Sequence, residues 1–168
     1  MQPNRREPHF LCDAMLGGLA RWLRVAGYEA DFDVHVPDGE LVRRAFREKK
    51  VLLTSDSGIL ERYAVSEGLA SCVFVPRGLD VVQQLGHVLR ELALPMREPR
   101  CMECGGGLDT VPLQEVADEV PEKVRDQCEE FFRCRRCGKL YWHGTHWQSI
   151  SRRLSRAQRI AGGDSGLA

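Results

Sequence analysis

The chain has 168 residues, 43% hydrophobic and 29% charged, which are the proportions of an ordinary globular domain. No apolar run approaches the roughly 18 residues of a membrane span, and the interrupted apolar stretch near the N-terminus predicts no signal peptide. The 24 basic and 24 acidic side chains cancel to a net charge of zero, which by itself argues against nucleic-acid binding.

The first half of the chain alternates between short apolar runs and segments with helical spacing, as α/β domains do. Strands are predicted at 10–12, 28–33, 51–54 and 71–75, and helices at 16–26, 38–46, 58–67 and 80–92. Asp38 is expected to be the N-cap of the second helix. Four strands alternating with helices predict a mainly parallel sheet covered on both faces.

Three aspartates stand where strands of this sheet end. Asp13 and Asp56 come directly after apolar strands, and Asp38 opens the helix after the second strand. The carboxyl ends of parallel strands share one edge, so these side chains can converge there. Clustered carboxylates need a cation, and their hard oxygen atoms favour Mg or Mn over zinc. Such a site suits phosphodiester hydrolysis, whereas each aspartate alone could equally be a turn or cap residue.

Further residues near this edge are weaker candidates. Glu40 lies in the first turn of the second helix, and Thr54 could orient an acid or a bound water. Asp80 is the candidate for a fourth acid, although an N-cap of the helix at 80–92 is the favoured interpretation. Arg21 and Arg24 are candidate phosphate contacts, with a solvated helix face as the alternative.

Two cysteine pairs follow a linker marked by Pro95 and Pro99. The pairs are separated by 29 residues and each is followed by glycine; they are Cys101/Cys104 and Cys134/Cys137. Four thiolates close a tetrahedral shell, so the spacing predicts a structural zinc site. Paired cysteines without a secretory signal indicate a reducing compartment, and we expect the protein to be cytoplasmic.

Charges are segregated in this second half. Residues 109–130 carry eight acids and two bases, whereas residues 133–160 carry eight bases and no acid. Basic side chains interleaved with aromatic ones favour RNA binding. The candidates lie on a helix expected at 147–160: Trp147, Arg152, Arg153 and Arg156, with Arg159 on the same helix. Pairing of this helix with the acidic segment is the alternative.

These observations divide the chain into three parts. We expect a nuclease-like domain at 8–97 and a zinc ribbon at 98–160. The ribbon unit is expected to include an acidic helical insert at about 121–132 and a basic C-terminal helix. A disordered tail is expected at 161–168.

The blocks FLCDAMLGGLARWLRVAGYEADF, PDGELVRRA and VLLTSDSGILER, followed by the two cysteine pairs, resemble the Mut-seven C-terminal RNase family, a branch of the PIN-like nucleases. The resemblance runs from about Phe10 to Leu154. It implies a PIN-like three-layer α/β/α fold with a C-terminal zinc ribbon, metal-dependent RNA cleavage, and an acid set matching Asp13, Asp38 and Asp56. The chain departs from the family at Ser55, where an arginine is usual and one phosphate contact is lost.

The sequence therefore predicts a ribonuclease that holds Mg or Mn on carboxylates and uses its zinc ribbon to bind RNA. Structured RNA such as tRNA or rRNA is a candidate substrate, and no membrane partner is expected. The alternative is a PIN-like module that binds RNA or a ribonucleoprotein without cutting it. A toxin of a toxin–antitoxin pair is a third hypothesis, against which the appended ribbon argues.

Overall fold

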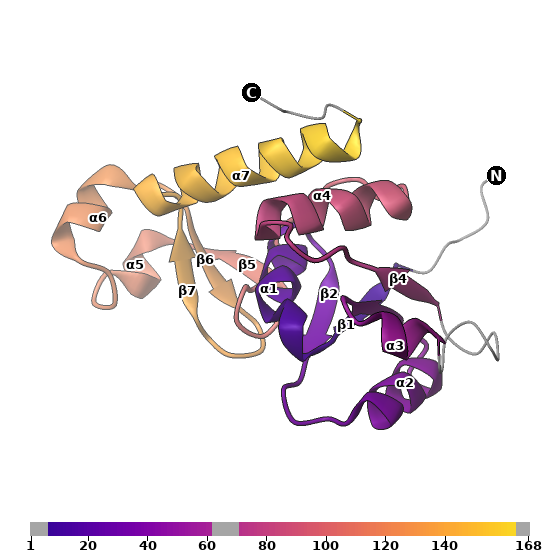
Figure 1. The fold of residues 1–168 in the computed structure, drawn as a ribbon. Coiled ribbons are helices and arrows are strands. Elements are labelled where there is room, and N and C mark those ends of the chain that lie inside the picture. The colour runs from indigo at the N-terminus through magenta and orange to yellow at the C-terminus, as the bar shows by residue number, and fades with distance from the viewer. Residues whose placement is uncertain (1–6, 62–70, 164–168) are drawn as a thin grey trace, which may run out of the picture.

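The computed structural model describes residues 7–61 and 71–163 (Figure 1). Its larger sheet has four parallel strands in the order β2-β1-β3-β4. The strands are β1 (His9–Cys12), β2 (Glu29–Phe32), β3 (Val51–Thr54) and β4 (Cys72–Phe74). The connecting helices are η1 (Ala14–Leu16), α1 (Gly17–Val25), α2 (Asp38–Arg47), α3 (Ser57–Ile59) and α4 (Val81–Glu91). The predicted α/β alternation and parallel sheet are confirmed, and residues 62–67 of the predicted third helix lie outside the described residues.

Helices cover both faces of this sheet and make three layers. Phe10 and Cys12 of β1 point into a core shared with α1 and α4, whereas Leu11 between them packs with α2 and Ile59. The central strands β1 and β3 are therefore buried on both faces. Double burial explains why their sequences are continuous apolar runs rather than alternating ones.

The second sheet is antiparallel and forms the ribbon. It consists of β5 (Leu108–Val111), β6 (Phe131–Cys134) and β7 (Leu140–Trp142), with α5 (Leu113–Val116) and α6 (Glu122–Gln127) in the acidic insert. The helix predicted at 121–132 is wrong beyond residue 127. Phe131 and Phe132 instead lie in the central strand of this sheet, where their backbones pair with β5 and β7.

The basic helix α7 (Thr145–Ala161) packs along α4 rather than on the ribbon alone (Figure 1). Ala157 of α7 is fully buried in the same core as Phe10, and Leu154 packs against that core. The hydrophobic core of the α/β unit thus includes a segment far beyond the boundary expected at residue 97. Ala161, where the tail was expected to begin, is the last helical residue, and residues 164–168 lie outside the described part. Within residues 7–61 and 71–163 no helix combines the length and apolarity needed to cross a membrane.

Gly86 lies where α4 meets α7. A Cβ atom added there would come 2.7 Å from Ile160 Cβ and 2.9 Å from the Ala157 carbonyl oxygen. Because backbone cannot yield as a flexible side chain does, we expect Gly86→Ala to lower the free energy of unfolding by about 1–3 kcal/mol in urea denaturation.

Gly18→Ala is the matched control, because its new Cβ would meet only Val81 Cγ2 at 3.6 Å. In that helical position alanine is expected to stabilise by up to about 1 kcal/mol. Equal stability of wild type and Gly86→Ala would show that the α4–α7 contact is looser than these distances indicate.

Candidate active site and metal centre

The sheet topology places the segments that carry the three predicted acids at the carboxyl end of the sheet, but within residues 7–61 and 71–163 their carboxylates do not form a group at metal-binding separation. Strand β1 lies between β2 and β3, so the segments that follow these strands emerge side by side. Asp13 follows β1, Asp56 follows β3, and Asp38 begins α2 after β2. The N-cap of α2 is Pro37 rather than Asp38, because the Pro37 carbonyl accepts the first helical hydrogen bonds and no side chain caps this end.

Asp13 is buried, and its carboxylate accepts three hydrogen bonds. Its Oδ2 accepts from Thr54 Oγ1 at 2.6 Å and from the Ser55 backbone N–H at 3.0 Å. Its Oδ1 accepts from the Met15 N–H at 2.8 Å, which caps η1. Thr54 Oγ1 in turn accepts from the Asp56 N–H at 3.0 Å. Thr54 therefore joins the turns after β1 and β3, and the Asp13 carboxylate is held in one orientation.

The Asp56 and Asp80 carboxylates cap helices. Asp56 accepts from the Gly58 N–H at 2.8 Å. Asp80 accepts from the N–H groups of Val82 and Gln83 at 2.9 Å, and its other oxygen lies 3.1 Å from Arg156. Burial alone would raise the pKa of Asp80, but the Gln83 N–H and the Arg156 guanidinium outweigh it and lower that pKa. The N-cap role that the sequence favoured for Asp80 therefore accounts for this carboxylate without a metal.

Glu40 lies on the surface of α2. Its carboxylate pairs with Arg43 at 3.0 Å and with Arg47 at 3.6 Å, along the same helix. The Glu40 carboxylate is therefore engaged in exposed ion pairs with arginines of its own helix.

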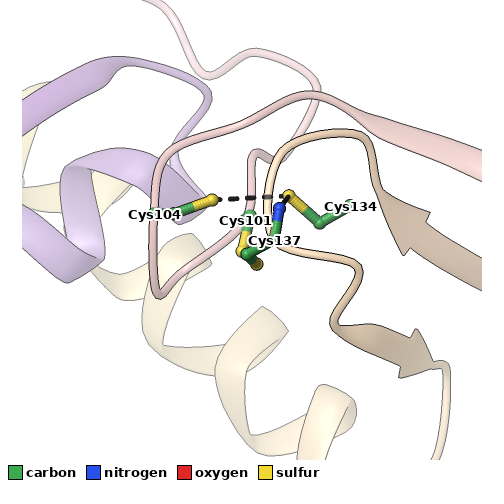
Figure 2. A group of neighbouring side chains, drawn as sticks. All are labelled: Cys101, Cys104, Cys134 and Cys137. Carbon is green, nitrogen blue, oxygen red and sulfur yellow. Dashed lines mark hydrogen bonds between the residues drawn. The ribbon is translucent and has the colours of Figure 1, made fainter.

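The four paired cysteines converge at the start of the ribbon (Figure 2). All four Sγ atoms lie within 4.8 Å of one another, with Cys101 and Cys137 at 3.6 Å and Cys104 and Cys134 at 3.4 Å. Among residues 7–61 and 71–163, this is the sole group of three or more His, Cys, Asp or Glu side chains at metal-binding separation. Four thiolates in this arrangement fit a tetrahedral structural zinc ion.

Backbone N–H groups donate hydrogen bonds to two of the four cysteine sulfurs. The Gly106 N–H donates to Cys104 Sγ at 3.4 Å, and the N–H groups of Arg136 and Cys137 donate to Cys134 Sγ at 3.4 and 3.5 Å. Burial would raise the pKa of Cys134, but these two N–H donors outweigh it and lower the pKa. The turns need a positive φ at the glycine that follows each pair, 75° at Gly105 and 74° at Gly138.

Arg24 fastens the first cysteine loop to the α/β unit. Its Nε donates to the Ala30 carbonyl at 2.8 Å, and its Nη1 donates to the carbonyls of Met102 and Glu103 at 3.0 and 2.6 Å. The phosphate contact predicted for Arg24 is therefore replaced by a structural role. Arg21, one turn earlier, stays exposed, 3.5 Å from the Glu103 carboxylate.

Helix α7 presents its predicted RNA-binding residues unequally. Arg153 lies over the Trp22 ring at 5.8 Å, Arg156 pairs with Asp80, and Trp147 stacks on His143 at 4.8 Å. Arg152 and Arg159 are exposed and make no ion pair within the described residues. The alternative that α7 pairs with the acidic segment is not seen there, because the α7 ion pair reaches Asp80 of the α/β unit.

The family model of the Mut7-C RNAse domain matches residues 8–154. The chain belongs to the Mut7-C RNAse domain family. Searches of curated proteins and of solved structures found no significant match. The match includes β1 with Asp13, all four cysteines and more than half of α7. The α/β unit and the ribbon of this Mut7-C RNAse domain are thus parts of one family pattern.

Sequence reasoning missed the residues that join these two parts of the Mut7-C RNAse domain. Glu103, inside the first cysteine pair, accepts from Lys139 Nζ at 2.8 Å as well as facing Arg21. Arg100 donates to the Gly105 carbonyl at 2.8 Å and pairs with Glu29 of β2 at 2.5 Å. The only sequence signal for these contacts was a charged residue, Glu103, between two paired cysteines. Its partners Arg21 and Lys139 lie far from it along the chain.

Proposed function

We propose that this protein is a metal-dependent ribonuclease that hydrolyses RNA phosphodiester bonds at the carboxyl edge of its parallel sheet. The observation that carries the proposal is the buried Asp13 carboxylate, linked through Thr54 to the turn that holds Asp56. Membership in the Mut7-C RNAse domain family supports RNA as the substrate.

In this proposal Asp13, Asp38 and Asp56 hold Mg or Mn. Bound there, the divalent ions would supply water activation and stabilisation of the leaving oxygen. The chain's own contribution is preorganisation: three donors fix the Asp13 carboxylate before substrate arrives. Thr54 is a positioning residue, because its hydroxyl bonds both Asp13 and the Asp56 backbone. Fixed ligands matter because a misplaced group loses much of its effect on rate.

Cleavage of RNA in the presence of manganese tests the proposal. Wild type and Asp13→Asn are incubated with tRNA, rRNA and single-stranded RNA, with a chelator as the metal-free control. We expect wild type to cut at least one of these with manganese and the variant to be inactive. Absence of cleavage by wild type, or full activity of the variant, would overturn the mechanism.

The basic helix is proposed as the path of the RNA backbone. Arg152 and Arg159 are seven residues apart and so share one face of α7. We expect the double substitution to glutamine to weaken RNA binding and to flatten the slope of log Kd against log salt by about 1–2. Fluorescence anisotropy of labelled RNA in chelator, at several salt concentrations, measures this slope.

Arg135→Gln is the control for that experiment, because Arg135 is already paired with Asp109 at 2.5 Å. Its salt slope should equal that of wild type. An unchanged slope in the α7 double variant would place the RNA elsewhere.

A module that binds RNA without cutting it is the second candidate. It is favoured by the capping roles of Asp56 and Asp80, which give these acids a structural purpose. This candidate predicts that Asp13→Asn binds RNA as wild type does, and that neither protein cleaves under any divalent metal.

A further inference from the structure

Three exposed apolar side chains lie just after β1 and at the end of β2. Met15 is 63% exposed, Phe32 40% and Val34 53%. Met15 comes two residues after Asp13, and the other two flank the end of β2. Single exposed apolar residues are ordinary, but a group beside a polar site is typical of a ligand contact.

The β1–β2 register places Phe32 close to Asp13. Phe32, the last residue of β2, pairs with Cys12, and Cys12 immediately precedes Asp13. Neighbouring strands are about 4.8 Å apart. The backbone of Phe32 therefore lies beside the end of β1, next to the residue that precedes Asp13.

The Phe32 ring lies close against the backbone of Gly17. A Cβ atom added to Gly17 would lie 2.5 Å from Phe32 Cζ, so the ring occupies space that only glycine leaves open. The ring therefore rests on the start of α1 while much of it remains exposed. Arg21, one turn along the same helix, is also exposed, and its guanidinium lies 3.5 Å from the Glu103 carboxylate.

We propose that Phe32 stacks on an unpaired base next to the scissile phosphate and so positions the RNA strand for cleavage. The inference rests on the proposed ribonuclease function and adds a residue that positions its substrate. An aromatic ring stacks on any base without sequence preference, and a base inside a duplex is already stacked on its neighbours.

The test compares cleavage of one RNA sequence as a single strand and in a duplex. We expect wild type to prefer the single strand, and Phe32→Ala to lower kcat/KM on it about 5- to 100-fold. Phe32→Tyr should restore the rate, because the ring is kept. Phe32→Leu should not, although it keeps most of the bulk over Gly17.

Phe46→Ala is the matched control. Phe46 is 54% exposed, but it lies in the last turn of α2, about 12 Å along the helix from Asp38. Its removal should leave cleavage unchanged. An RNA with an abasic site beside the cut should be a poor substrate for wild type and no poorer for Phe32→Ala.

A binding measurement separates this inference from the proposed function. In chelator, where no cleavage occurs, a single-stranded RNA carrying 2-aminopurine should lose fluorescence on binding wild type and Phe32→Tyr but not Phe32→Leu. Equal quenching by all three, or equal cleavage by wild type and Phe32→Leu, would overturn the stacking role while leaving the ribonuclease intact. Quenching without cleavage of any RNA would overturn the ribonuclease and keep the stacking site.

Discussion

Asp13→Asn is expected to lower the rate of RNA cleavage by at least about 100-fold, because it removes a ligand charge from the proposed metal site. The asparagine oxygen can still accept from the Met15 N–H, so the cap of η1 is kept. The amide cannot accept from the Ser55 N–H as the carboxylate does, and this lost bond should cost about 1–3 kcal/mol of stability. Single-turnover cleavage with manganese and urea unfolding measure the two effects.

Two further variants make this result specific. Glu91→Gln removes an exposed carboxylate at the end of α4 and should leave cleavage and stability unchanged. Thr54→Val keeps the Asp13 charge but removes its 2.6 Å hydrogen bond, so we expect a smaller loss of rate than in Asp13→Asn. A folded Asp13→Asn protein that cleaves as wild type does would remove Asp13 from the mechanism.

Cys134→Ser is expected to abolish zinc binding and unfold the ribbon. Structural zinc sites of this kind contribute about 10–16 kcal/mol of binding free energy that is coupled to folding. The ribbon has little else to stabilise it, since its own buried cluster consists of Val116, Val120 and Phe131. We expect one zinc ion per chain in wild type, released by a thiol-blocking reagent and measured with a colorimetric chelator, and none in the variant.

Cys128→Ser is the control, because Cys128 lies at the end of α6 and contacts the His143 carbonyl rather than the other cysteines. It should retain one zinc ion and the wild-type amide exchange pattern. In Cys134→Ser, faster exchange should extend to α1, because Arg24 donates to carbonyls inside the first cysteine pair. Stoichiometric zinc in Cys134→Ser would refute the four-cysteine site.

Features with a local or periodic signal were predictable from the amino-acid sequence alone. The parallel sheet followed from apolar runs such as Val51–Thr54, which are buried on both faces and need no partner to be recognised. The four-cysteine cluster followed from ligand spacing, because a tetrahedral ion restricts the geometry of each pair. The cap at Asp80 followed from its residue type and its place at the start of a predicted helix.

The positions of these pieces relative to one another depend on contacts between residues far apart in the chain, which only the folded structure shows. The residue type of Phe131 is compatible with a helix or a strand. Pairing of its strand with β5 and β7 makes it a strand residue. The Arg24 guanidinium can donate hydrogen bonds to a phosphate or to a carbonyl. In the structure the acceptors are carbonyls of the first cysteine loop. Likewise, the sequence predicted a basic helix at 147–160, but only the close approach at Gly86 shows that this helix packs on α4. Net charge zero was similarly uninformative, because it sums over the chain while binding depends on which charges remain unpaired at one surface.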